Sequence, residues 1–136
     1  MDSFRAKELC RQKQYDAVLA MYQNGRPNAF WTCWDYYYYA YALQKTQHYA
    51  KGHEIARLGM IAFPQFTRLH YSYCWCLYYL YIQKYDEKRD DPRRFRRAAD
   101  AILQYSRQEP YSPYTLTVWK VVDSLRGRPG HTAAEI

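Results

Sequence analysis

The chain has 136 residues, of which 49% are hydrophobic and 19% aromatic, and a formal net charge of +7. This length predicts one domain that can bury a core without disulfides or a metal ion. No stretch approaches the roughly 18 uninterrupted apolar residues of a membrane helix, and no secretory signal pattern opens the chain. We therefore expect a cytoplasmic protein with no membrane partner, and the positive charge suggests an acidic protein or a nucleic acid as partner.

Apolar residues at helical spacing, separated by turn residues, predict helices throughout the chain. The four tyrosines at 36–39 have strand propensity, but Ala40 and Leu43 continue the run at helical spacing. Pro64 and Pro110 are predicted to end helices. In chain order, the predicted helices cover about residues 3–12, 14–24, 29–45, 48–62, 67–83, 92–107 and 113–125.

The sequence also contains a repeat. Leu9, Leu43 and Leu77 are spaced 34 residues apart, and each follows a small residue by three positions. A fixed period of this length predicts paired helices stacked in an array. The charged stretch 84–92 is predicted to be an insertion in the turn between the two helices of the third pair, and residues 127–136 a flexible tail.

The second repeat unit carries aromatic, small and proline residues at set offsets, namely Tyr36, Tyr39, Ala40, Leu43, Tyr49, Gly52, Ala56, Gly59 and Pro64. In this pattern the chain resembles the tetratricopeptide repeat family. The resemblance implies an all-α fold, a TPR-like α-solenoid of about three helix-turn-helix units plus a C-terminal capping helix, over residues 1–126. It also implies that Ala40, Gly52 and Gly59 lie where paired helices approach closely.

Three aromatic strings, at residues 34–37, 73–78 and 110–114, are similar to strings in tetratricopeptide modules of prokaryotic conflict proteins such as the TOTE systems. This similarity implies a role in defence against foreign nucleic acid, as a scaffold beside nuclease or helicase parts. No enzymatic motif of such systems is present in the sequence.

In tetratricopeptide folds the first helix of each pair lines a concave face, which here implies an aromatic groove with a cationic rim. Such a groove suits a peptide or helix of a partner protein, because aromatic residues and arginine dominate interface hot spots. It also suits single-stranded nucleic acid, through stacking of bases. The alternative is that these rings pack against neighbouring helices. The predicted groove residues are Lys7, Arg11, Trp34, Tyr37, Tyr41, Gln44, Lys45, Arg68, Tyr71, Trp75 and Tyr78.

A basic cluster stands at the predicted start of the helix over residues 92–107, where positive charge is unfavourable to the helix dipole. We expect these side chains to form a solvated face beside the aspartates and glutamate of residues 86–91. The alternative is a patch for an acidic partner or a phosphate backbone. The cluster consists of Arg93, Arg94, Arg96 and Arg97.

No pattern of metal ligands or catalytic groups is present. Cys74 and Cys76 lie two residues apart on a predicted helix and point about 200° away from each other, so they cannot chelate together. Cys10 and Cys33 have no complementary cysteine–histidine spacing, and all four are predicted to be buried thiols. Because the sequence contains no recognisable nucleophile–base pair and no glycine-rich phosphate loop, we expect no enzyme activity, no metal and no cofactor.

These observations predict a non-catalytic protein–protein interaction scaffold or adaptor that binds a partner segment in the aromatic groove. The alternative function is a basic nucleic-acid-associated accessory subunit of a nucleoprotein complex. A third alternative is a homo-oligomer that pairs through the last helix, which carries Leu116, Trp119, Val122 and Leu125.

Overall fold

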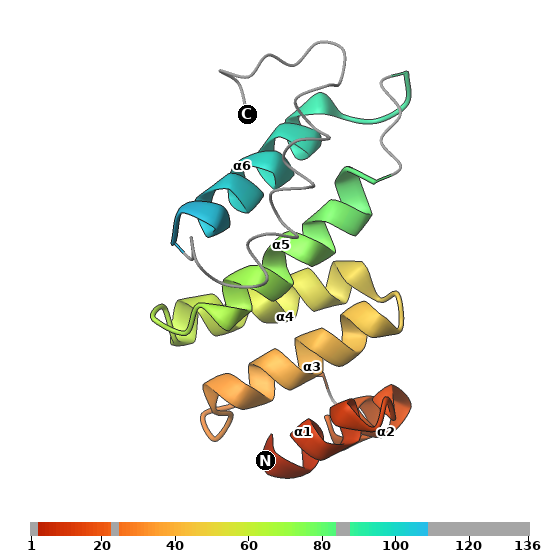
Figure 1. Ribbon diagram of the computed structural model, residues 1–136, viewed down its shortest axis with the longest axis vertical. Coiled ribbons are helices and arrows are strands. Elements are labelled where there is room, and N and C mark those ends of the chain that lie inside the picture. Colours follow the sequence, from red (N-terminus) through yellow and green to blue (C-terminus); the bar gives the residue numbers. More distant parts are fainter. Residues whose placement is uncertain (1–2, 23–24, 84–87, 109–136) are drawn as a thin grey trace. The chain divides into compact units, whose positions relative to one another are not determined.

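A computed structural model describes residues 3–22, 25–83 and 88–108 (Figure 1). These residues form six helices and no strand, which confirms the all-α prediction for this part of the chain. The helices are α1 (Ser3–Arg11), α2 (Tyr15–Met21), α3 (Cys33–Lys45), α4 (Tyr49–Ala62), α5 (Arg68–Tyr81) and α6 (Pro92–Gln108). The chain divides into two compact units, Met1–Cys76 and Leu77–Ile136, and α5 contributes to both.

The first six predicted helices are present, and most of their ends agree to within a few residues. The start of α3 at Cys33, in place of the predicted residue 29, is the main correction. Thr32 and Asp35 form a capping box: the Thr32 backbone N–H donates to Asp35 Oδ2 at 2.7 Å, and the Asp35 N–H donates to Thr32 Oγ1 at 3.4 Å. Such a pair satisfies two backbone donors and fixes where a helix begins. The predicted helix over 113–125, the tail 127–136 and residues 84–87 of the predicted insertion lie outside the described residues.

Helix α2 also ends earlier than predicted, at Met21. Tyr22 follows it, is 3% exposed, and donates its hydroxyl to Asp35 Oδ1 at 2.8 Å. The chain then passes through Gly25, whose φ of 59° lies in the left-handed region that glycine adopts without strain. The bond of Tyr22 to Asp35 and the turn at Gly25 explain why α2 ends before the predicted position.

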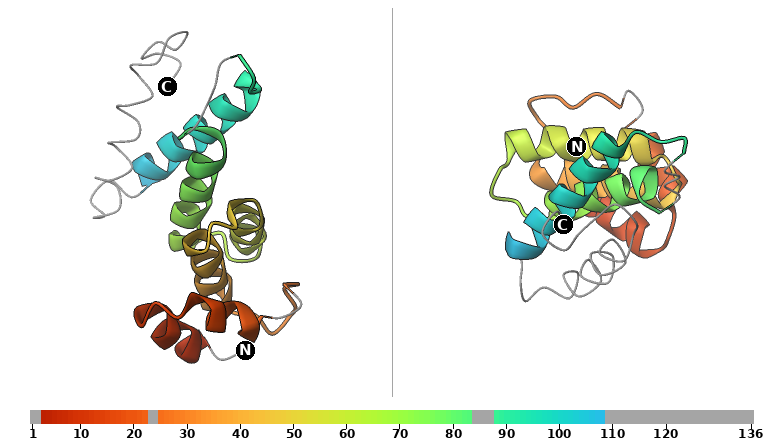
Figure 2. Two further views of the ribbon diagram at one scale, coloured as in Figure 1. Left: turned by 90° about the vertical axis from the view of Figure 1, so that its right-hand side faces the viewer. Right: turned by 90° about the horizontal axis from the view of Figure 1, so that it is seen from above.

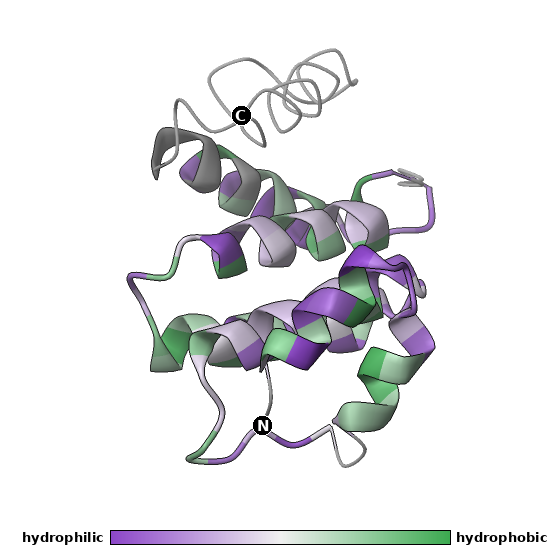
Figure 3. Ribbon diagram, turned by 60° about the horizontal axis from the view of Figure 1, so that its bottom comes forward, coloured by the Kyte–Doolittle hydropathy of each residue, from purple (hydrophilic) through white to green (hydrophobic). Residues whose placement is uncertain are grey.

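Helix α3 is the centre of the first unit. It contacts α1, α2 and α4, and α4 lies antiparallel along it (Figures 1 and 2). The four consecutive tyrosines at 36–39 are all buried, so this helix buries side chains on several faces at once. Figure 3 shows pale and purple residues mixed with green ones along these helices, because tyrosine scores near the middle of the hydropathy scale although it fills this core.

Small residues stand where helices approach closely, as predicted. Ala40 is fully buried, and a Cβ added to Gly59 would come within 2.9 Å of Tyr36 Cβ and 2.7 Å of Leu69 Cδ1. A Cβ on Gly52 would come within 2.9 Å of Cys76 Sγ. Contacts this short leave no room for a larger residue without movement of the neighbouring helix.

The second unit contains the end of α5 and the described part of α6. One face of α6 is buried through Phe95, Ala98, Ala99 and Leu103, while the arginines of the basic cluster at its start are exposed. Leu77 and Ile82, at the end of α5, are buried as well. None of the helices in the described ranges is both long enough and apolar enough to span a membrane.

The hydrogen bond from Tyr22 to Asp35 gives a first prediction. The Asp35 side chain is fully buried, and a buried carboxylate that loses a donor costs about 1–3 kcal/mol. We expect Tyr22→Phe to lower the free energy of unfolding by that amount in urea denaturation. Tyr36→Phe is the matched control, since Tyr36 is 7% exposed and its hydroxyl bonds no residue in the described ranges. Equal losses in the two variants would contradict the importance of this bond.

His53 on α4 gives a second prediction. Its ring lies 5.9 Å from the Tyr73 ring, and burial lowers the pKa of His53 below its ordinary value of 6.5. As the pH falls through 6.5, the unfolded chain takes up a proton that the folded chain resists, so the free energy of unfolding falls. We expect this decrease, measured from about pH 7 to about pH 5, to be smaller in His53→Gln than in the wild type. The exposed residue His48 supplies the control, because His48→Gln should keep the wild-type decrease.

Candidate functional site

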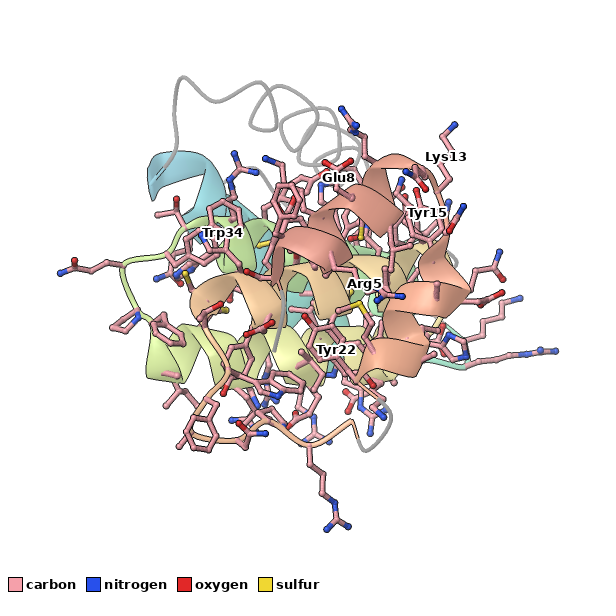
Figure 4. All side chains as sticks on the ribbon, turned by 90° about the horizontal axis from the view of Figure 1, so that it is seen from below. Arg5, Glu8, Lys13, Tyr15, Tyr22 and Trp34 are labelled. Atoms are coloured by element: carbon pink, nitrogen blue, oxygen red, sulfur yellow. The ribbon has the colours of Figure 1, made fainter. Side chains whose placement is uncertain are left out.

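A row of aromatic rings runs along α3. The Trp34 ring lies 6.2 Å from the Tyr37 ring, and Tyr37 stacks on Tyr41 at 6.1 Å. Tyr41 continues the row to Tyr15 on α2, with ring centroids 6.0 Å apart. In Figure 4, Trp34 and Tyr15 accordingly lie well apart, at the two ends of this row. Helical spacing of three and four residues places the three α3 rings on one side of the helix.

Two cations lie over this row. The Arg68 guanidinium, from the start of α5, is 5.3 Å from the Trp34 ring and 5.7 Å from the Tyr37 ring. Lys45 Nζ, from the end of α3, is 5.4 Å from the Tyr41 ring. Each cation is attracted by the negative face of the ring, which holds a long side chain in place while its charge stays at the surface.

Phe66, in the turn between α4 and α5, completes this site. Its ring lies 4.9 Å from Trp34 and 6.3 Å from Tyr37. Phe66 was not among the residues predicted for the groove. We use the name aromatic face for the six residues in contact here, which are Trp34, Tyr37, Tyr41, Lys45, Phe66 and Arg68.

The predicted groove residues differ widely in exposure. Three of them are buried, Tyr37 at 6%, Gln44 at 8% and Trp75 at 8% exposed, so the prediction that their side chains lie open to a partner is wrong. They pack inside the helical layers because the helices are too close together to leave these positions free. The exposed ones are Lys7, Arg11, Trp34, Lys45 and Arg68, and the partly buried ones are Tyr41, Tyr71 and Tyr78.

Several of the predicted groove residues lie outside the aromatic face. Arg11 pairs with Glu8 on its own helix at 2.8 Å, which neutralises much of its charge. Tyr71 lies 6.1 Å from Trp75 on α5, and Tyr78, which belongs to the second unit, lies 5.3 Å from Tyr79. Lys7 is exposed on α1.

An apolar pocket of about 430 Å³ opens beside the aromatic face. It lies between the start of α3 and the turn that joins α4 to α5. For this turn, the sequence predicted only that Pro64 ends a helix. The signal that could have found it is the apolar string of residues 61–66, which is unusually hydrophobic for a turn. The pocket is lined by Cys33, Ala62, Phe63, Pro64, Gln65 and Phe66.

The four arginines of the basic cluster, at the start of α6, are all exposed, as the solvated-face prediction expects. Arg93 Nε lies 3.2 Å from Asp91 Oδ1, and Asp91 Oδ1 also accepts the Arg93 backbone N–H at 2.9 Å. This contact holds the pKa of Asp91 below its ordinary value. Arg94 lies over the Tyr81 ring at 5.9 Å. Arg96 and Arg97 complete the basic face.

Three of the four cysteines are buried thiols. Burial raises the pKa of the Cys10 thiol to about 11 and that of Cys76 to about 12, and it also raises the pKa of Cys74. These thiols are therefore protonated and unreactive at neutral pH. Cys33 is only partly buried, which corrects the prediction of four buried thiols. In the described ranges, no three histidine, cysteine or acidic residues form a group that could hold a metal ion.

Comparisons of the chain with protein-family models, with curated proteins and with solved structures found no match.

Proposed function

We propose that this chain is a non-catalytic adaptor with a TPR-like arrangement of helix pairs, which binds a segment of a partner protein on the aromatic face. The observation that carries this proposal is the contact of Arg68 with Trp34 and Tyr37. Trp34 remains 36% exposed although three aromatic rings and a guanidinium surround it. A partly open tryptophan beside a fixed arginine combines the two residue types most enriched at binding hot spots.

The repeat supports the same proposal. Trp34 and Arg68 are separated by the 34-residue period, so they occupy equivalent positions in successive units. Equivalent positions of neighbouring units lie side by side in a stacked array, and these two side chains are in contact. Such an array presents one continuous surface made from the first helix of each pair, which suits an extended segment or a helix of a partner.

Charge indicates which partner this face would prefer. Helices α3 and α5 contain one carboxylate between them, Asp35, and its side chain is fully buried. The exposed charges at the aromatic face are those of Lys45 and Arg68. An acidic segment would therefore meet complementary charge here.

The basic face of α6 favours a second candidate function, an accessory subunit that contacts a nucleic acid. All four arginines point away from the buried face of that helix, and phosphate contacts from such a row give affinity that falls steeply with salt. Arg93 and Arg94 already contact Asp91 and Tyr81, respectively. This candidate ranks below the adaptor, because Arg93 already pairs with a carboxylate, that of Asp91.

Two matched charge reversals separate the two functions. Lys45→Glu with Arg68→Glu changes the aromatic face, and Arg96→Glu with Arg97→Glu makes the same change of charge on α6. We expect the first pair to reduce recovery of a specific partner protein in affinity purification by about tenfold or more, because two hot-spot contacts become repulsive. The second pair should leave that recovery unchanged.

The readouts are quantitative mass spectrometry of the recovered proteins and measurement of co-purified nucleic acid at low and high salt. Equal protein recovery with the aromatic-face variant would contradict the adaptor proposal. Nucleic acid that is recovered at low salt by the wild type, and lost only in the α6 variant, would favour the accessory-subunit function.

A further inference from the structure

The apolar pocket and the aromatic face share one wall. Phe66 lines the pocket, and its ring also contacts Trp34 at 4.9 Å. A ligand that lies on the aromatic face at Trp34 therefore reaches Phe66, which also lines the pocket. At about 430 Å³ the pocket is a shallow, open depression that has room for a bulky side chain.

The surroundings of the pocket are unusually apolar for a surface. Phe30, three residues before Cys33, is 82% exposed, and Ile61, directly before Ala62, is 67% exposed. Phe63, which lines the pocket, is half-buried. Both segments that form the pocket therefore carry apolar side chains that water can reach. Exposed apolar residues so close in the chain to the residues that line a pocket favour an interaction surface here.

Charge defines what would cover this surface. The segments 25–35 and 58–70, which supply the pocket and its neighbours, contain one carboxylate, Asp35, and its side chain is fully buried. They also contain two exposed arginines, Arg26 and Arg68. The surface is therefore apolar and positive, which complements an acidic segment with an apolar side chain.

We infer that the partner segment carries a bulky apolar anchor that enters the pocket and a carboxylate nearby that pairs with Arg68. This inference rests on the proposed adaptor function and names the chemistry of its partner. The ring and guanidinium separations place Arg68 within about 10 Å of Phe66. An extended segment rises about 3.3 Å per residue, so the carboxylate lies at most about three residues from the anchor.

The test is selection of a displayed library of random peptides against the full chain, with an unrelated protein of similar charge as background. We expect enriched peptides to contain leucine, phenylalanine or methionine with aspartate or glutamate no more than about three residues away. Ala62→Phe fills the pocket from an exposed position at the end of α4, and Ala50→Phe makes the same change at an exposed position near the start of α4. Affinity of the enriched peptides should fall at least about tenfold in the first variant and stay unchanged in the second.

Cys33 supplies a second readout, because it lines the pocket and is the one cysteine that is not buried. An enriched peptide should slow alkylation of Cys33 by N-ethylmaleimide, and the same peptide with its anchor changed to serine should not. Slow alkylation of the chain alone that depends on its own concentration would place a second copy in the pocket and overturn the inference.

Two further outcomes separate this inference from the adaptor function. The enriched peptides could bind the Ala62→Phe variant with normal affinity but fail to bind the variant with Lys45→Glu and Arg68→Glu. This result would support the adaptor function and overturn the pocket inference. Enrichment of basic peptides would overturn it too. If no peptide is enriched on the full chain relative to the unrelated protein, the adaptor function and the pocket inference are both overturned.

Discussion

The position of α3 depends on one fully buried carboxylate. Asp35 accepts hydrogen bonds from the Thr32 backbone and from the Tyr22 hydroxyl, so it joins the start of α3 to the end of α2. A carboxylate removed from water is tolerated only when donors surround it, and here the positive end of the helix dipole adds to them. Because this contact joins the first turn of α3 to the end of α2, it also helps to orient the side of α3 that carries Trp34 and Tyr41.

Tyrosine serves two purposes in this unit. At residues 36–39 its rings fill the core, where leucine or valine would be usual, and their polar tips tolerate the limited access to water that a small unit cannot avoid. At Tyr41 the same residue type lies at the edge of the core and carries Lys45 on its ring. The core and the aromatic face are therefore continuous along α3. The packing of the core also fixes the positions of the α3 rings that belong to the aromatic face.

The sequence predicted the helices well because their signals are local. Periodicity and proline positions depend on residues close together in the chain, and the 34-residue register repeats these local patterns. Gly52 and Gly59 mark close helix contacts as expected. The site was predicted only in part. Tyr37 and Trp75 were expected to be open, but helical spacing gives the side of a helix and not the distance to the next one. Phe66 was missed because a turn residue has no periodic signal, and its role depends on contacts with α3.

The arrangement of cations on rings explains why this face suits recognition. A free lysine or arginine side chain loses conformational entropy of up to about 2 kcal/mol when a partner fixes it. Arg68 and Lys45 are already held over Trp34, Tyr37 and Tyr41, so part of that cost is met in the folded chain before any partner arrives. The same contact keeps Trp34 partly covered while no partner is present, which limits the apolar area in water. A partner carboxylate would then pair with cations that the rings already hold in place. The affinity at this face would depend more on this preorganisation of Arg68 and Lys45 than on the surface area that binding buries.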